Sequence, residues 1–274
     1  MRLITELHNR HLNQPIWIAG SDPTLAEYPD SFLEDKVGVT LHLAHVKFPG
    51  ATYRYANEYD RVDYLKRAFP SFRTQANIFG WPFYGKSRRD SRALTKDMDK
   101  AYFLHWRIYP PAGIREHVDW KYTWRKVRQA RAAVSVTYGG HGSCLHGALY
   151  SAVMMGASPI NIIGSGHGRA GSGEQFSAVT DIDKTMRPWI RSFSDPINNV
   201  PMIEQTLAII DACRKEGIEV NWYKSYDGGR LERLVIDKEE IFALKEQLLR
   251  QFALSKKLKN LIKRIYYPIL NSIQ

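Results

Sequence analysis

The sequence predicts an α/β domain with a mostly parallel sheet, and three observations support this fold class. Short apolar runs of strand length alternate with helical stretches along the 274-residue chain. Polar, glycine-rich tips follow two of these runs, as at the carboxyl ends of strands in open α/β sheets. A glycine-rich loop, a helix, a glycine and a strand follow one another in the middle of the chain, which is typical of a parallel α/β unit.

The order of the elements suggests one Rossmann-like domain over 1–253 and an arm over 254–274. Strands are expected at 15–19, 37–43, 51–56, 75–81, 101–108, 159–164 and 218–222. Helices are expected at 145–155, 202–215 and 239–254. The segment of about 168–201 has little periodicity and is rich in Gly, Ser, Asp and Arg. An aperiodic segment of this length inside a compact domain is usually functional, so we expect it to form a lid.

Charge indicates which classes of partner the chain could bind, and cysteine content indicates its redox compartment. The chain has 39 Lys and Arg against 28 Asp and Glu, a formal net charge of +11. Such a charge attracts polyanions such as nucleic acid, anionic lipid or nucleotide phosphates, although it also serves solubility alone. Two cysteines provide no disulfide framework, which favours a reducing, cytoplasmic compartment. No apolar stretch has the length of a membrane span.

The first candidate binding segment follows the strand expected at 15–19. It reads GSDPTL over 20–25. Gly20 permits close approach of backbone or ligand, and Ser21 and Asp22 place polar groups at the strand's end. In open α/β sheets ligands bind at this end of the strands. A plain strand-to-turn connection is the alternative interpretation.

The second candidate segment lies around the central helix. The sequence YGGHGSC at 138–144 leads into an apolar, small-residue-rich helix. The start of this helix, at Gly142 and Ser143, offers free backbone N–H groups to a phosphate. Gly156 ends the helix, and the strand 159–164 then runs into a second polar tip, SGHGR at 165–169.

Together the two segments resemble the bacterial CST-type sialyltransferases. Residues 16–25 resemble that family's apolar strand followed by Gly-Asn-Gly-Pro-Ser-Leu, and residues 143–164 resemble its Thr-Ser-Gly, helix, Gly, strand and Gly segment. Related motility-accessory-factor and pterin-pyrophosphokinase-like domains share the second pattern. The resemblance implies a Rossmann-like glycosyltransferase that uses a nucleotide sugar, with a cytidine-monophosphate (CMP) sugar as the usual donor, and needs neither a metal ion nor a further cofactor. It implies nucleotide binding by Gly20, Ser21, Asp22, Asn57, Gly142, Ser143, Gly164 and Ser165.

The chain departs from this family pattern at three places. Ser21 stands where the family has Asn, and Asp22 stands where it has its second Gly. The family's Gly-Ile-Asp after the second strand is Gly164-Ser165-Gly166 here, so its acid is absent. The lid histidine that serves as base in the sialyltransferases has no counterpart, because no histidine follows His167. These departures bear on both activity and donor identity.

Metal-independent sugar transfer requires a base for the acceptor hydroxyl and groups that stabilise the departing phosphate. His167 is the best candidate base, because it lies on a glycine-flanked tip at a strand's carboxyl end; an exposed loop histidine is the alternative. Three lid arginines are candidates to clamp the phosphate, although a solvated surface explains them equally well: Arg169, Arg187 and Arg191.

Other polar groups in this region favour simpler interpretations. His146 lies within an apolar stretch and is expected to be a packed histidine. Cys144 is expected to be a small buried thiol rather than a nucleophile. No Asp-x-Asp pair follows a strand to hold a divalent ion, and the His and Cys residues lack zinc spacing.

Two further function classes stay open. A pyrophosphokinase-like phosphotransferase on the same fold would consume ATP and require magnesium. A nucleic-acid-binding protein would use the net charge and the stretch WKYTWRKVRQAR at 120–131, which combines stacking rings with basic groups. No recognised nucleic-acid module accompanies that stretch, so we rank this class last.

The C-terminal arm is predicted to bind a membrane surface. Residues 254–273 read LSKKLKNLIKRIYYPILNSI, with apolar residues at steps of three and four and basic residues on the other faces. The expected pose is in the plane of an anionic membrane, on the cytoplasmic side, which suits a transferase whose acceptor is a glycan or lipid-linked glycan of the cell surface. A helix docked on the domain, or on a second copy in a homo-oligomer, is the alternative.

Overall fold

The computed structural model describes most of the sheet and the central helix. Described are residues 2–41, 44–56, 75–79, 100–103, 144–166, 213–237 and 239–244 and, within two further helices, residues 203, 206, 207, 209–211, 246 and 250. The strands in chain order are β1 (Arg2–Leu3), β2 (Ile16–Ala19), β3 (Val37–Leu41), β4 (Tyr53–Ala56), β5 (Ala76–Phe79), β6 (Ala101–Phe103), β7 (Ile160–Ile163), β8 (Val220–Asp227) and β9 (Arg230–Arg233). The helices are α1 (Ala44–Lys47), α5 (Cys144–Met154) and short 3-10 helices at Ile4–Leu7, Pro23–Glu27 and Asp30–Leu33.

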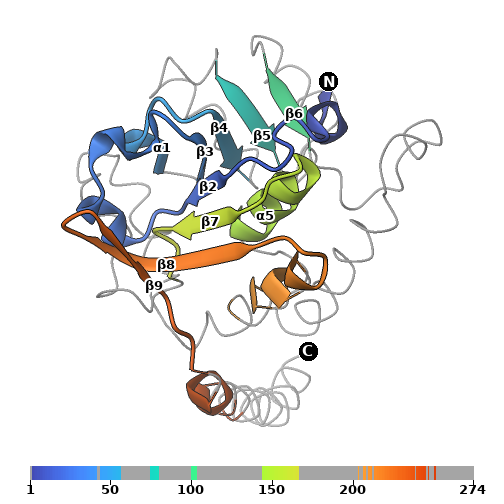
Figure 1. Cartoon of the computed structure of the whole chain (residues 1–274). Coiled ribbons are helices and arrows are strands. Elements are labelled where there is room, and N and C mark those ends of the chain that lie inside the picture. The colour runs from blue at the N-terminus through green and yellow to red at the C-terminus, as the bar shows by residue number, and fades with distance from the viewer. Residues whose placement is uncertain are drawn as a thin grey trace, which may run out of the picture.

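The nine strands form one sheet in the order β1-β6-β5-β4-β3-β2-β7-β8-β9 (Figure 1). Every neighbouring pair is parallel except β8 and β9. The central order β4-β3-β2-β7-β8 is that of a doubly wound sheet, in which the chain first moves outward on one side of β2 and then returns to its other side. The Rossmann-like, mostly parallel α/β fold is therefore confirmed.

One face of the sheet packs against α5 and holds the main core. Ile16 and Ile18 of β2 point to this face, as do Ile160 and Ile162 of β7, and all four are fully buried. Small residues bring α5 close to the sheet: a Cβ on Gly147 would lie 1.7 Å from the Tyr55 hydroxyl oxygen. This close packing explains why the helix is rich in Ala, Gly and Ser.

The opposite face carries an aromatic cluster under the β8–β9 hairpin. Trp17 of β2 stacks on Tyr223 with the ring centroids 6.0 Å apart, and Tyr28 contacts Tyr226 at 5.1 Å. The backbone N–H of Tyr226 donates to the Glu27 carboxylate over 3.1 Å. The hairpin is thereby fastened to the short helix that follows β2.

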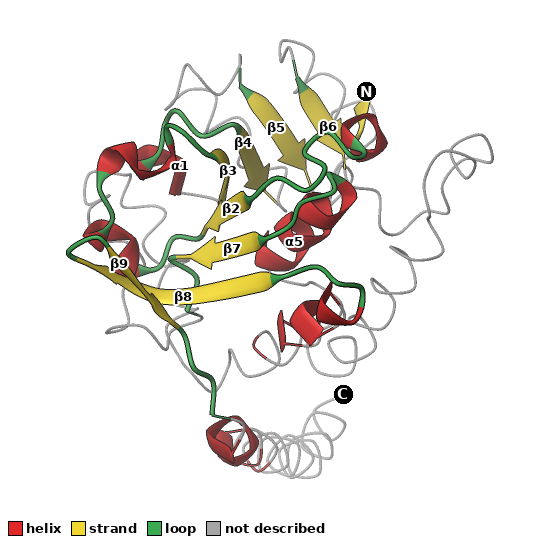
Figure 2. Cartoon of the chain, in the orientation of Figure 1, coloured by secondary structure: helices red, strands yellow, loops and turns green. Residues whose placement is uncertain are grey.

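This hairpin corrects the prediction of a last strand over 218–222. The strand runs instead over Val220–Asp227, and β9 folds back on it at the edge of the sheet (Figure 2). The connecting Gly228 and Gly229 have φ of +53° and +98°, values that a two-residue hairpin turn requires. Sequence periodicity missed β9 because its side chains are mostly exposed and show no apolar run.

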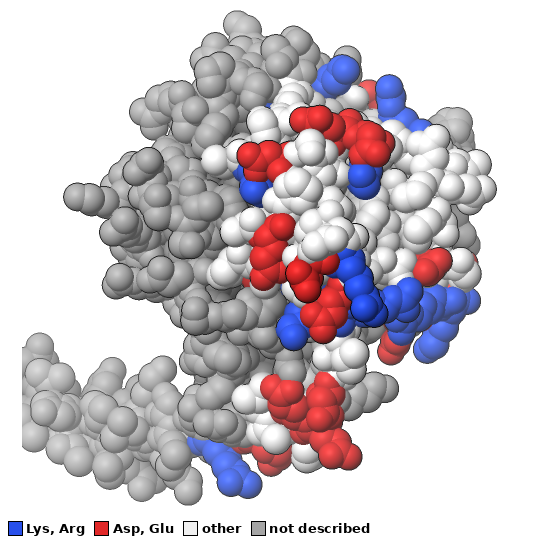
Figure 3. Space-filling view, turned by 60° about the vertical axis from the view of Figure 1, so that its left-hand side comes forward, with Lys and Arg blue, Asp and Glu red and all other residues white. Residues whose placement is uncertain are grey.

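The helix that begins at 239 packs on helical residues of 203–215. Ile241 and Ile203 are buried against each other, with Leu207, Ile236 and Leu244 beside them. The start of this helix carries three exposed acidic residues, Asp237, Glu239 and Glu240. In Figure 3, acidic side chains gather in the lower part of the view. Within the described part of the chain, no helix combines the length and apolarity needed to cross a membrane. The predicted arm at 254–274 lies outside the described residues.

Candidate functional site

The carboxyl ends of β2 and β7 form the topological switch point of the sheet. β2 pairs with β7 from Ile16↔Ile160 to Ala19↔Ile163, and its other neighbour is β3. The chain leaves β2 toward β3 on one side and returns to β7 on the other (Figure 1). Ligands of open α/β sheets bind outside the carboxyl ends of the strands at such a point.

The two predicted binding loops contact each other directly at this edge. The Gly20 N–H donates to the Ile163 carbonyl over 2.9 Å, and the Asp22 N–H donates to the Gly164 carbonyl over 2.8 Å. A Cβ on Gly20 would lie 2.2 Å from the Gly164 carbonyl oxygen, so only glycine fits there. Gly164 itself has φ +54°, which also favours glycine. Gly20 and Gly164 therefore lie at the same edge of the sheet.

The Asp22 side chain is directed into the protein. Its Oδ1 accepts from the Thr24 N–H and hydroxyl at 3.1 Å each, which caps the short helix at Pro23–Glu27. Its Oδ2 accepts from the Gly166 N–H at 3.2 Å, so the carboxylate joins the two loops. Burial raises the pKa of Asp22 above its ordinary value, and the hydrogen bonds from Thr24 and Gly166 oppose this rise.

The loop after β7 is also held from β8. The indole N–H of Trp222 donates to the Ser165 carbonyl oxygen over 3.1 Å. Ser165 and Ser21 are partly exposed, whereas Gly20, Asp22 and Gly164 are buried. Of the five predicted nucleotide contacts that the structure describes, only the two serines are therefore partly open to solvent.

The first turn of α5 lies at the same edge, because the helix runs back toward the start of β7. His146 is 1% exposed, and its Nε2 lies 2.9 Å from the Thr206 hydroxyl. Cys144 is buried and forms no disulfide. Both residues are packed inside the protein, as predicted. Their packing holds the first turn of α5 in the core.

The remaining predicted site residues lie outside the described residues. They are the predicted base, His167, the predicted phosphate clamp, Arg169, Arg187 and Arg191, and three predicted nucleotide contacts, Asn57, Gly142 and Ser143. Among the described residues, no group of three or more His, Cys, Asp or Glu is placed to hold a metal ion.

A polar row near this edge was missed by sequence analysis. The register aligns Thr40, Arg54 and Asn77 across β3, β4 and β5, on the face opposite α5. All three are buried, and burial lowers the pKa of Arg54 to about 10, so its guanidinium stays charged at neutral pH. Arg54 Nη2 donates to the Pro49 carbonyl over 3.5 Å. In the sequence, Arg54 lies in the stretch ATYRYA at 51–56, which predicts a strand but does not indicate a buried polar row.

Comparisons with known proteins give a distant structural likeness. No protein-family model and no curated protein sequence matches the chain. Among solved structures, a variant of the sialyltransferase CST-II in complex with CMP aligns over 84% of this chain and 97% of its own, at 9% identity and a TM-score of 0.45. CstII from Campylobacter jejuni with the substrate analogue CMP-3FNeuAc aligns over 84% and 97%, at 10% identity and a TM-score of 0.42.

A third solved structure extends the same comparison. The apo form of an alpha-2,3-sialyltransferase from Campylobacter jejuni aligns over 89% of this chain and 98% of its own, at 10% identity and a TM-score of 0.35. All three are named sialyltransferases. At these identities and TM-scores the likeness assigns no activity, so the function rests on the residues at the switch point.

Proposed function

We propose that this chain is a glycosyltransferase that moves a sugar from a nucleotide donor, of the CMP-linked type, to a hydroxyl of a glycan acceptor. One observation carries the proposal. The two segments that resemble the CST-type sialyltransferases lie far apart in the sequence, yet they meet through the 2.8 Å bond from the Asp22 N–H to the Gly164 carbonyl at the switch point. That point is where nucleotide ligands bind in this class of sheet.

The proposed reaction is a displacement at the sugar's anomeric carbon. The acceptor hydroxyl oxygen forms the new bond to that carbon, and the bond from the carbon to the phosphate oxygen breaks. Its electron pair leaves with the phosphate, so CMP is released, and the hydroxyl proton passes to a base. His167 is the proposed base, and Ser21 and Ser165 are proposed to donate hydrogen bonds to the nucleotide.

A thermal-shift panel tests the donor class. A ligand present at a hundred times its Kd stabilises the folded protein by about 2.7 kcal/mol, which raises the melting temperature measurably. The panel contains CMP, UDP, GDP, ATP and a single-stranded RNA, each with magnesium and with EDTA. We expect stabilisation by CMP that EDTA leaves unchanged. Stabilisation by ATP and magnesium alone would identify a phosphotransferase, and stabilisation by RNA alone would identify a nucleic-acid-binding protein.

Substitution of His167 tests the chemical step. H167A is expected to lower turnover about 100-fold, the lower range for general-base catalysis, while the Kd for CMP stays within twofold. The control is H8A, since His8 is exposed and lies outside the switch point. Unchanged turnover in H167A would remove this residue from the mechanism and leave the nucleotide-binding proposal intact.

We also propose that residues 254–273 hold the enzyme on the inner face of an anionic membrane. Five basic residues between 254 and 264, each worth about 1 kcal/mol near an anionic surface, give roughly 5 kcal/mol at low salt. The exposed acids Asp237, Glu239 and Glu240 would be repelled there, so the contact is expected to begin beyond them. Nearness to the membrane suits an acceptor that is a lipid-linked glycan.

Sedimentation with vesicles tests this anchor. The full chain should bind vesicles with phosphatidylserine and release them in high salt, and a chain that ends at Phe252 should not bind. A full chain with Lys256, Lys257 and Lys259 changed to Gln is the second variant, and we expect intermediate binding. Equal binding by the full and shortened chains would exclude the arm as the anchor.

A further inference from the structure

The peptide group between Ser165 and Gly166 is held at both of its polar ends. Its carbonyl oxygen accepts from the Trp222 indole N–H at 3.1 Å. Its N–H donates to the Asp22 carboxylate at 3.2 Å. The two partners come from different parts of the fold, since Trp222 lies on β8 and Asp22 follows β2. One peptide plane in the loop after β7 is therefore fixed by two side chains from outside that loop.

The polarity of the two partners permits only one orientation of this peptide. Rotation by half a turn would direct the Ser165 carbonyl at the Asp22 carboxylate and the Gly166 N–H at the indole N–H of Trp222. Both contacts would be repulsive, and both native hydrogen bonds would be lost. Trp222 is 6% exposed, Asp22 is 8% exposed and Gly166 is buried, so water is poorly placed to replace either partner.

The fixed peptide sets the direction of Ser165. The preceding carbonyl, of Gly164, accepts from the Asp22 N–H at 2.8 Å, so the backbone is held on both sides of this residue. Ser165 is partly exposed at the edge where β2 and β7 end. We propose that Trp222 and Asp22 act as positioning residues, which lock the Ser165–Gly166 peptide and thereby direct Ser165 to a bound nucleotide. This inference rests on the proposed nucleotide site at the switch point.

Conservative substitutions separate this role from packing. W222F keeps a ring in the core and removes the donor to the Ser165 carbonyl. D22N keeps an oxygen that caps the helix at Thr24, because Asn is as good a cap as Asp, and places an NH₂ group opposite the Gly166 N–H. The matched controls are W17F and D211N. Trp17 contacts Phe32 and Tyr223 on the other face of the sheet, and Asp211 is exposed.

The experiment titrates CMP into the full chain by calorimetry and measures amide exchange of Gly166 by NMR. We expect W222F and D22N each to raise the Kd for CMP about tenfold, the scale of one hydrogen bond to a charged or buried partner, and to accelerate Gly166 exchange. The double variant should lose less than the product of the two single losses, because both act on one peptide group. The controls should stay within twofold in both measurements.

Three results would decide against the proposal. Unchanged Gly166 exchange in both variants would show that the peptide is not locked by these side chains, whatever the protein binds. Faster exchange with an unchanged Kd would make the lock purely structural. Losses that multiply fully in the double variant would mean that the two residues act separately. Absence of CMP binding by the unmodified chain is a different outcome, which counts against the proposed function, and the exchange data then still test the lock itself.

Discussion

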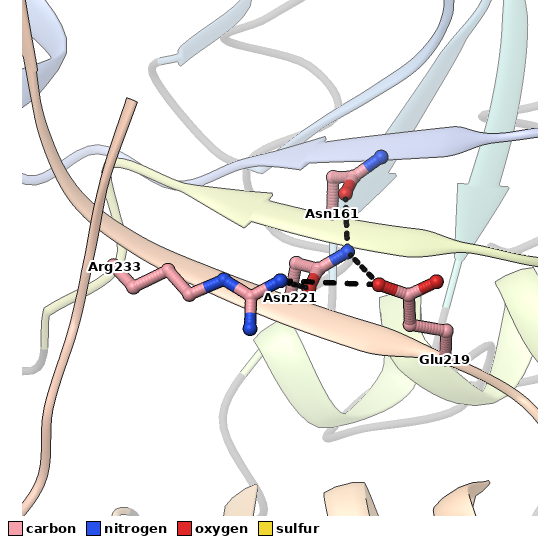
Figure 4. Close-up of polar contacts among 4 residues, drawn as sticks. All are labelled: Asn161, Glu219, Asn221 and Arg233. Atoms are coloured by element: carbon pink, nitrogen blue, oxygen red, sulfur yellow. Dashed lines mark hydrogen bonds and ion pairs between the residues drawn. The ribbon is translucent and has the colours of Figure 1, made fainter. Parts of the chain in front are cut away.

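Polar side chains are used in opposite ways at the two ends of β7. Near its amino end, the buried Asn221 donates to Asn161 over 3.2 Å and to Glu219 over 3.0 Å, and it accepts from Arg233 over 2.9 Å (Figure 4). Beyond its carboxyl end, Asp22 and Trp222 hold the backbone of the loop at 164–166. The side chains of the first group form hydrogen bonds with one another, whereas those of the second group form hydrogen bonds with the backbone of a loop.

Under the proposed function, this difference distinguishes the end of the sheet that binds the nucleotide from the end that only stabilises the fold. The amide network joins β7, β8 and β9 and fastens the hairpin to the sheet. The loop contacts stabilise less regular backbone and leave two serines partly exposed. Substitutions at the two ends should therefore separate stability from ligand binding.

The largest effect is expected from G20A at the carboxyl edge. The added Cβ would lie 2.2 Å from the Gly164 carbonyl oxygen and 2.8 Å from the Ser165 side chain, so the two loops must move apart. We expect a loss of about 3 kcal/mol in the free energy of unfolding, typical of severe overpacking, together with loss of CMP binding. Urea unfolding and calorimetry measure the two. The control G50A, where a Cβ meets nothing within 4 Å, should change stability by less than about 0.5 kcal/mol.

A smaller effect, on stability alone, is expected from N221A at the amino ends. The substitution leaves the buried Asn161 oxygen without its donor from β8 and removes the acceptor of Arg233. We expect a loss of about 2 kcal/mol with no change in the Kd for CMP. The control E219A removes a side chain that is 62% exposed and should cost less than about 1 kcal/mol. Weaker CMP binding in N221A would remove the distinction between the two ends.

The smallest effect concerns the pH dependence that Asp22 adds to stability. Burial raises its pKa above 3.8, so the folded protein retains this proton to a higher pH than the unfolded chain does. The contribution of Asp22 is complete below its unfolded pKa and is lost as the pH rises through its folded pKa. The free energy of unfolding of the unmodified chain should therefore fall relative to that of D22N as the pH rises from about 4. Urea titrations across this range would contradict the account if that difference rose with pH.

The sequence predicted the sheet and the loops at the ends of β2 and β7 better than the contacts between those loops. Apolar runs marked β2 and β7, because buried parallel strands need them, and glycines marked the tips where the backbones approach. This chain lacks the family's acid at 166, and the Gly166 N–H instead donates to the carboxylate of Asp22, on the neighbouring loop, over 3.2 Å. These residues are 144 positions apart in the chain, so no local pattern reveals the contact.

The β8–β9 hairpin, at the outer edge of the sheet, was predictable only in part. Asp227-Gly228-Gly229 is a turn signal of the kind that joins two hairpin strands. The strand that follows it has mostly exposed side chains, and its stability derives from pairing with β8 and from the bond between Arg233 and Asn221. Trp222 was assigned to a strand correctly, but its role at Ser165 depends on how β8 lies beside β7.

Hydrogen–deuterium exchange of the full chain with and without CMP tests the central claim most directly. If the nucleotide binds at the switch point, peptides that contain the loops at 20–25 and 164–166 should exchange more slowly when CMP is bound. Peptides of the β8–β9 hairpin that contain Arg233 and not Trp222 should exchange at the same rate in both samples. Slower exchange in these hairpin peptides, with the two loops unchanged, would contradict a nucleotide site at the carboxyl ends of β2 and β7.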